Sequence, residues 1–204
     1  MSRGDRVVGR GGLSGLVGGR QAPTYRAIYD WVEREGIRDL VDVGANTGAL
    51  GQLLTHWGYR GRYTAVENNP HALAQARREL AEAGVEAPRL INGNVRALPF
   101  ADREVDAVAM KDVLEHLEDY RPALAEVMRV ARRWVVIGVF LPWRADAEKR
   151  HCEPGGFYLN AYLERDVLEF ARGHGFEVAE RVETIEADAS GDLPNEVVVF
   201  RRVD

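Results

Sequence analysis

A buried strand that ends in a glycine turn constrains this 204-residue chain more than any other feature. Leu40 to Val43 forms an apolar run, Gly44 and Gly48 follow it, and helical spacing of apolar residues resumes at Ala49. A strand that stops at such a turn presents backbone N–H groups, and glycine lets a ligand approach them closely. The segment therefore predicts a site for a nucleotide-like cofactor, although plain turn chemistry would also explain two glycines.

Strand-like and helical segments alternate along most of the chain. This alternation predicts an α/β fold, a doubly wound and mostly parallel seven-stranded sheet with a C-terminal antiparallel hairpin. The expected parallel strands are 38–43, 63–66, 89–91, 105–110 and 134–139, and the expected helices lie at 23–35, 49–57, 70–83, 117–130 and 161–172. The hairpin is expected from two β-rich segments, 176–185 and 196–202, because residues 187–194 are too few for a helical crossover.

Two segments fall outside this repeat. Residues 1–20 contain seven glycines and four arginines, so we expect a flexible Gly/Arg-rich arm followed by one domain over residues 21–204. Residues 141–160 mix Pro, Gly, charged and aromatic residues over a span that is long for a connection, and we expect a lid there.

Composition narrows the function classes. No apolar run approaches the ~18 residues needed to cross a bilayer, and the single cysteine, Cys152, cannot form an internal disulfide. We therefore expect a cytoplasmic protein with no membrane partner. Beyond the arm the chain carries 23 basic and 31 acidic residues, so nucleic acid is not an expected partner, although the basic arm itself can touch a polyanion.

The ends of four predicted strands should meet at one edge of the sheet, where ligands of such folds bind. Those ends are the Gly44 turn, Glu67, Asn94, and Lys111 with Asp112. An acid at Glu67, 23 residues after Gly44, can accept hydrogen bonds from both hydroxyls of a ribose. Taken alone, Glu67 could be a solvated acid at the end of a strand. Taken alone, Asn94 could be an ordinary loop amide.

Two phosphate-binding motifs do not fit the glycine turn. Gly48 is followed by Ala49 and Leu50, without the lysine of a Walker loop. Asn46 stands where the dinucleotide fingerprint needs glycine. We therefore expect a nucleoside cofactor without phosphates.

Four segments in order resemble the class I S-adenosylmethionine-dependent methyltransferases, especially the small type 11 subgroup, over about residues 36–202. Residues 40–48 look like their first motif, Val66-Glu67 like the ribose-binding acid, 94–100 like the adenine-side loop, and 106–117 like the fourth motif. The resemblance implies a Rossmann-like enzyme that transfers a methyl group from S-adenosyl-L-methionine to an O or N atom of a small-molecule acceptor.

The resemblance also implies roles for individual residues. Gly44 and its neighbours would contact the methionine part of the cofactor, Glu67 the ribose, and Asn94 with the Val95 N–H the adenine. Many members have Asp at the position of Asn94, and an amide still accepts through its oxygen. The predicted cofactor-binding residues are Asp42, Gly44, Ala45, Asn46, Gly48, Glu67, Asn68, Asn94, Val95, Lys111 and Asp112.

Methyl transfer from a sulfonium is an in-line displacement, so holding the reactants in line can supply ~7 kcal/mol or more. An O or N nucleophile that carries a proton must still lose it. His116 or His151 can accept that proton because imidazole titrates near neutrality. For His151 a plain surface position is the favoured interpretation.

Asp112, Glu115 and His116 have the i, i+3, i+4 spacing of one helical face, and with His151 they would form a mixed O/N metal site suited to Mn, Fe or Zn. Related Glu-x-x-Glu-His segments are implicated in metal binding in small-RNA 2′-O-methyltransferases and ubiquinone-pathway O-methyltransferases. Relatives with no known metal also carry Glu-His-Leu, so a divalent metal is possible but not expected.

Aromatic residues gather in and near the predicted lid: Trp143, Phe157, Tyr158 and Tyr162. They either wall an acceptor pocket or pack the lid on the body.

The alternative functions are an RNA 2′-O-methyltransferase, favoured by the basic arm and the candidate metal site, and a nucleotide-dependent dehydrogenase or nucleoside-binding module on a similar fold. Asn46 speaks against the dehydrogenase.

Overall fold

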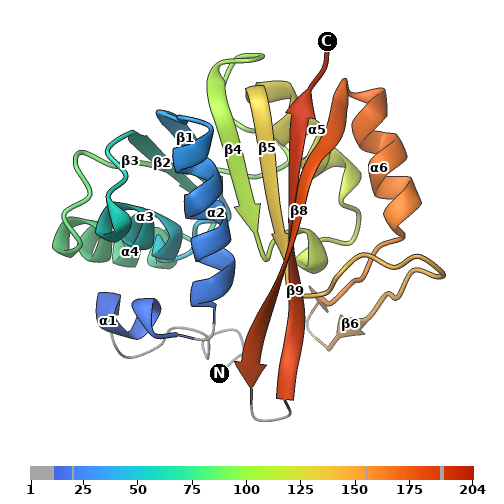
Figure 1. Cartoon of the computed structure of the whole chain (residues 1–204), viewed down its shortest axis with the longest axis horizontal. Helices are drawn as coiled ribbons and strands as arrows, with labels where there is room; N and C mark the ends of the chain where they lie inside the picture. Colours follow the sequence, from blue (N-terminus) through green and yellow to red (C-terminus); the bar gives the residue numbers. More distant parts are fainter. Residues whose placement is uncertain (1–11, 20, 155, 189–190) are drawn as a thin grey trace.

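A single seven-stranded sheet organises the molecule, seen here in a computed structural model that describes residues 12–19, 21–154, 156–188 and 191–204. Its spatial order is β3 (Arg89–Asn92), β2 (Arg62–Glu67), β1 (Asp39–Val43), β4 (Val105–Lys111), β5 (Ala131–Val139), β9 (Gly191–Arg202) and β8 (Phe176–Asp188) (Figure 1). The first five strands are mutually parallel, and β9 is antiparallel to both β5 and β8. The predicted fold class is confirmed.

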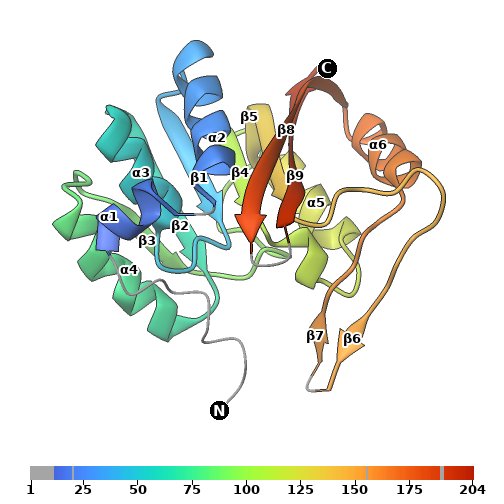
Figure 2. The ribbon, with the colours of Figure 1, turned by 60° about the horizontal axis from the view of Figure 1, so that its bottom comes forward.

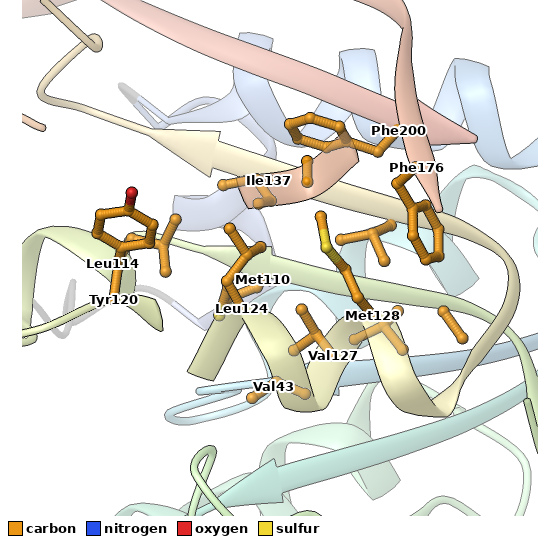
Figure 3. Packing of buried hydrophobic residues seen from close by; sticks show 14 of the residues in the cluster. Val43, Met110, Leu114, Tyr120, Leu124, Val127, Met128, Ile137, Phe176 and Phe200 are labelled. Carbon is orange, nitrogen blue, oxygen red and sulfur yellow. The ribbon is translucent and has the colours of Figure 1, made fainter. Parts of the chain in front are cut away.

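Helices cover both faces of the sheet. One face packs against α2 (Ala22–Arg34), α3 (Ala49–Trp57) and α4 (Pro70–Glu82), and the other against α5 (Arg121–Val130) and α6 (Glu164–Gly173). Successive buried residues of β4 serve opposite faces: Ala107 and Ala109 face the first group, whereas Val108 and Met110 belong to the core shown in Figure 3. Burial on both faces explains why β4 is continuously apolar.

The connection from β3 to β4 contains no helix, and all of its residues, 93–104, are described. Leu98 and Phe100 from this connection are buried and complete the apolar cluster on the α5 side. The segment that follows Asn94 is thereby fixed against the sheet.

The C-terminal hairpin is longer than predicted. β8 and β9 pair from Phe176 opposite Arg202 to Asp188 opposite Gly191, so the loop expected over residues 187–194 is wrong. Pro194 is tolerated in the strand because β5 pairs with β9 only from Glu196 onward. Before Glu196, β9 has β8 as its one neighbour. The other side of this two-stranded ribbon is free, and a proline, which lacks an N–H, is tolerated there.

The helix expected over residues 117–130 is also corrected. A short 3₁₀ helix, Leu114–His116, follows β4, and α5 begins only at Arg121. Pro122 lies in the first turn of α5, where its missing N–H costs nothing. The helix expected over 161–172 begins later, at Glu164.

The predicted lid contains a small hairpin. β6 (Cys152–Glu153) pairs with β7 (Phe157–Tyr158), and bridges at Arg144–Leu163 and Lys149–Ala161 hold its two arms together. Figure 2 shows the hairpin projecting from the body of the protein.

Part of the predicted arm lies outside the described residues, namely residues 1–11 and 20. Within the remainder, α1 (Gly12–Val17) forms a short helix that contacts α3. No helix in the described part of the chain is long and apolar enough to cross a membrane.

Candidate functional site

The carboxyl ends of β1, β2, β3 and β4 meet at one edge of the sheet, the lower edge in Figure 1. The N–H groups of Gly44 and Ala45 both donate to the carbonyl of Val66, at 2.8 and 3.2 Å, and so bring the glycine turn beside the end of β2. The sequence prediction that these strand ends converge is therefore confirmed.

The glycine turn has three residues in the left-handed region: Gly44 at φ +75°, Asn46 at +49° and Gly48 at +78°. Two of them also pack too closely for a side chain. A Cβ on Gly44 would lie 2.3 Å from a methyl carbon of Val113, and a Cβ on Gly48 2.9 Å from Leu80. The glycines are therefore required by the fold as well as being suited to a ligand.

Glu67 lies buried at the end of β2 and supports this turn. One carboxylate oxygen accepts the Asn46 N–H at 2.9 Å, and the other accepts the Asn69 N–H at 2.8 Å. Because a carboxylate offers about four acceptor positions, both oxygens can still accept from a diol. The acid is not a merely solvated strand end.

Asp42 is buried beneath the turn, in contact with Tyr63 of β2. Burial raises the pKa of Asp42 to about 7, while the hydrogen bond from Tyr63 and the charge of Lys111 act in the opposite direction. Its contact is made inside the protein rather than at the edge. Asp42 therefore links β1 to β2 just before the turn.

The predicted adenine-side residues flank the end of β3. Asn94 is exposed, and its side-chain oxygen accepts the Arg96 N–H at 2.9 Å. Asn68 contributes its backbone carbonyl to Asn92, whose side chain also donates to the carbonyl of Glu67. Asn92 thus anchors the β2 end, a role that the sequence analysis missed because a strand-end amide has no distinctive pattern.

Lys111 and Asp112 form a largely buried ion pair at the end of β4. Gln21 donates to the same Asp112 oxygen at 3.1 Å, and the Lys111 ammonium lies 4.8 Å from the centre of the Tyr25 ring. Neither Gln21 nor Tyr25 was predicted to lie at this edge, because both precede the glycine turn by some twenty residues and belong to no motif. The start of α2 thereby joins this edge.

Glu115 is buried at the turn after β4, with 1% of its surface exposed. One oxygen accepts the Phe140 N–H at 2.8 Å, and the other has no hydrogen-bond partner. Burial, followed by the charge of Asp112, raises the pKa of Glu115 to about 8. The residue is therefore held largely as a neutral acid near pH 7.

His116 lies under the lid hairpin. Its Nδ1 is 3.0 Å from the backbone carbonyl of Tyr158, and its ring stacks near Phe157, with centroids 4.6 Å apart. Phe140 lies 5.6 Å away on the body of the protein. A carbonyl only accepts, so Nδ1 carries a proton, and in the neutral ring Nε2 then keeps the lone pair.

The structure does not gather the predicted metal ligands. Asp112 has a left-handed backbone and Glu115 and His116 lie in a 3₁₀ turn, so the expected helical face does not exist. His151 is exposed at the base of the hairpin, where its backbone N–H bonds to Asn160 at 3.1 Å. Across the described ranges no three His, Cys, Asp or Glu side chains are arranged to hold a metal.

The predicted aromatic cluster divides into two pairs. Trp143 and Tyr162 are buried, the former near Phe200 and the latter against Tyr120, so they pack the lid on the body. Phe157 is 45% exposed, beside the half-buried Tyr158. Only the second pair can face an acceptor.

The donor set at this edge fits an adenosyl amino acid. Glu67 offers a carboxylate that can accept from the hydroxyls of a nucleoside sugar. The N–H groups of Gly44, Ala45, Asn46 and Gly48 donate within the protein, so the turn contributes close approach rather than free donors. Asp112 adds an oxygen that is buried without a partner, beside the Lys111 ammonium. A cationic group and an anionic group on one ligand would both find a partner there.

Comparison with known proteins finds methyltransferases. Residues 41–136 match the family model described as "Methyltransferase domain". A ubiquinone/menaquinone biosynthesis C-methyltransferase of Paracoccus denitrificans is 32% identical over 108 residues, which are 52% of this chain and 43% of that protein. The chain spans less than half the length of the first curated relatives it matches.

Solved structures share the fold. Magnesium protoporphyrin IX methyltransferase of Synechocystis PCC 6803, with bound S-adenosylhomocysteine, has a TM-score of 0.68 at 15% identity, covering 90% of this chain and 83% of that one. 1,6-Didemethyltoxoflavin-N1-methyltransferase of Burkholderia thailandensis has a TM-score of 0.67 at 20% identity, covering 94% and 85%.

Proposed function

We propose that this chain is a class I S-adenosylmethionine-dependent methyltransferase. It transfers a methyl group to a small organic acceptor held between the sheet edge and the lid at residues 141–160. The observation that carries the proposal is the Glu67 carboxylate beside the Gly44–Gly48 turn, bonded to both Asn46 and Asn69. We propose one methyltransferase domain over residues 21–204.

The proposed cofactor site uses three strand ends. The Gly44 turn would hold the methionine part, Glu67 would accept from the ribose hydroxyls, and Asn94 with the Val95 N–H would meet the adenine. S-Adenosylmethionine supplies an electrophilic sulfonium methyl when bound. The chain contributes alignment, since the site is built on strand ends fixed by backbone hydrogen bonds.

His116 is the proposed base for the acceptor. Its Nε2 is available because Nδ1 keeps the ring proton and donates it in a hydrogen bond to the Tyr158 carbonyl. A proton received at Nε2 would raise the electron density of a hydroxyl, an amine or a conjugated carbon of the acceptor. His151 has no comparable support, because its contacts are made by the backbone.

The acceptor atom in this proposal is O or N, and carbon is the second candidate. Carbon is favoured by the name of the Paracoccus relative, a C-methyltransferase. The RNA alternative is supported less, since one of its two grounds, the four-residue metal site, is not formed by the described residues.

Thermal unfolding with ligands tests the cofactor. S-Adenosylhomocysteine should raise the melting temperature and NAD should not, because binding to the native state alone stabilises it. Stabilisation by NAD alone would reject the proposal. Glu67→Gln should lose most of the S-adenosylhomocysteine effect, whereas Glu82→Gln, an exposed acid on α4, should keep it.

The Glu67 carboxylate also accepts the Asn46 N–H of the glycine turn, so Glu67→Gln could weaken cofactor binding by disturbing the turn alone. A second measurement separates these two effects. We would measure the affinity of wild type and Glu67→Gln for S-adenosylhomocysteine and for its 2′-deoxy analogue. If Glu67 accepts from the 2′-hydroxyl, the two losses are non-additive. Additive losses would assign Glu67 to turn support only.

A further inference from the structure

The segment that leads from the lid hairpin back to α6, residues 157–163, holds the short turn that carries His116. The carbonyl of Tyr158 lies 3.0 Å from Nδ1 of His116, and the Tyr162 hydroxyl donates to the carbonyl of Leu117. Between these two contacts, Asn160 bonds to the residues on both sides of His116.

Asn160 uses its backbone and its side chain for these bonds. Its N–H donates to the Glu115 carbonyl at 2.9 Å, and its side-chain amide donates to the Leu117 carbonyl at 2.8 Å. Its side-chain oxygen accepts the His151 N–H, from the opposite arm of the lid, at 3.1 Å. The residue is completely buried. One asparagine therefore ties both arms of the lid to the two neighbours of His116.

The same turn is held from the body of the protein. The Phe140 N–H, at the end of β5, donates to the Glu115 carboxylate at 2.8 Å. Val113 packs so closely on Gly44 that a Cβ there would lie 2.3 Å from a valine methyl carbon, so the turn starts beside the glycine turn. The orientation of His116 relative to the glycine turn therefore depends on how residues 115–117 are held.

We propose that Asn160 is a positioning residue for His116. It fastens the lid to residues 115–117, and the fastened lid presents the Tyr158 carbonyl to Nδ1. That bond keeps the ring proton on Nδ1 and leaves the lone pair of the neutral ring on Nε2. A neutral amide suits this task, since it donates and accepts at once and adds no charge beside the imidazole. The inference rests on the proposed function, in which His116 is the base.

The bonds of Asn160 lie at the base of the lid, whereas the tip is exposed. Phe157 is 45% exposed, with its ring centre 4.6 Å from that of His116. An acceptor that displaces the Phe157 ring need not break the bonds of Asn160. His116 therefore keeps its tautomer while the tip of the lid adjusts.

The test compares Asn160→Leu and Asn160→Ser with the same two changes at Asn195. Leucine has nearly the shape of asparagine without its hydrogen bonds, and serine is one bond too short to donate to Leu117. Asn195 is also buried, with 2% exposed, and its amide donates to Thr24 at 3.4 Å instead of to the lid. The Asn195 variants therefore control for the loss of a buried amide as such.

Nitrogen-15 NMR of the neutral imidazoles reports which ring nitrogen carries the proton. Wild type and the Asn195 variants should show His116 protonated on Nδ1. Both Asn160 variants should lose that signal, because a ring without a fixed acceptor exchanges between its two tautomers. His174 should keep its Nδ1 signal in every variant, since its partner is the Phe170 carbonyl at 2.8 Å.

Amide hydrogen exchange locates the change. The His151 N–H should exchange about 2- to 10-fold faster in both Asn160 variants, the range for one lost hydrogen bond. The Leu124 N–H of α5, which donates to the Tyr120 carbonyl at 2.8 Å, should keep its rate.

An unchanged His116 tautomer in the Asn160 variants would overturn the inference even if their stability falls, because a purely structural amide affects stability alone. The same loss of the His116 signal in the Asn195 variants would overturn it as well. If Asn160→Leu fails to fold, Asn160→Ser carries the test. Wild-type protein that does not bind S-adenosylhomocysteine would instead reject the proposed function, on which the tautomer signals do not depend.

Discussion

The Tyr63 hydroxyl donates a 2.5 Å hydrogen bond to the Asp42 carboxylate, and both side chains are buried beneath the glycine turn. The Tyr63 ring also occupies the space above Gly51, where a Cβ would lie 2.5 Å from a ring carbon. One contact therefore links β1, β2 and α3 directly below the proposed cofactor site.

Tyr63→Phe should reduce the free energy of unfolding by about 1–3 kcal/mol, because it leaves a buried carboxylate without its donor. Tyr59→Phe is the matched control. It removes a similarly buried hydroxyl that donates to the Arg62 carbonyl at 3.2 Å, and a neutral hydrogen bond contributes only about 0.5–1.5 kcal/mol. Urea denaturation measures both. Equal losses of unfolding free energy in the two variants would show that the hydrogen bond from Tyr63 to the Asp42 carboxylate is no stronger than a neutral one.

Gly44→Ala should be markedly more destabilising than Gly36→Ala. Both glycines have positive φ, +75° and +65°, so both variants bear the left-handed penalty of about 1–2 kcal/mol. Only at Gly44 does the new Cβ meet a neighbour, since nothing lies within 4 Å of it at Gly36. Overpacking adds about 1–3 kcal/mol.

Denaturation of both glycine variants isolates this packing term. Adding Val113→Ala to Gly44→Ala should recover part of the stability difference between the Gly44→Ala and Gly36→Ala variants. The second substitution removes the valine methyl that the new Cβ meets. Identical stability of the two single glycine variants would mean that Val113 moves aside without cost.

The sheet could be predicted from sequence because its signals are local and repeated. The β4 run is apolar on both faces, and Pro70 after the capping Asn69 marks the start of α4. The predictions were wrong where contacts between distant segments determine the secondary structure. Residues 187–194 were expected to form the hairpin loop, yet most of them pair as strand, and Pro194 lies where β9 has only β8 as a neighbour.

The site could be predicted only in part. Gly44 and Glu67 have a characteristic spacing along the chain, and they meet at the turn. Gln21 reaches Asp112 from 91 residues away, and His116 meets the lid through a backbone carbonyl that any residue type would supply at position 158. Such contacts leave no pattern in one sequence. The helical spacing of Asp112, Glu115 and His116 misled, because it presumed a helix that the left-handed Asp112 prevents.

Glu115 should make stability depend on pH. Its pKa is about 8 in the folded protein against 4.5 as the ordinary value, chiefly because it is buried. The folded state therefore keeps a proton that the unfolded state releases, and wild-type stability should fall as pH rises from about 4.5 to about 8 and then level off. Glu115→Gln stays neutral, so its stability relative to wild type should rise over that window by roughly 2–5 kcal/mol.

Urea unfolding at about pH 5 and about pH 9 tests this linkage. Glu82→Gln, which removes an exposed carboxylate from α4, should follow the wild-type pH dependence. A constant difference between Glu115→Gln and wild type at both pH values would contradict the inferred protonation of Glu115. Phe140 offers its N–H to either side chain, so the comparison retains that hydrogen bond.

His116 should populate the tautomer that is protonated on Nδ1. Its Nδ1 faces the Tyr158 carbonyl at 3.0 Å, and a carbonyl oxygen can only accept. Nitrogen-15 NMR of the neutral imidazoles should show a protonated Nδ1 signal that disappears in His116→Ala, while a second such signal, from His174, remains. His174 is an internal reference, since its Nδ1 lies 2.8 Å from the Phe170 carbonyl and should show the same tautomer. A His116 signal with Nε2 protonated would remove the lone pair on which its proposed role as base depends, whereas the expected tautomer directs that lone pair away from the Tyr158 carbonyl and leaves it available to an acceptor.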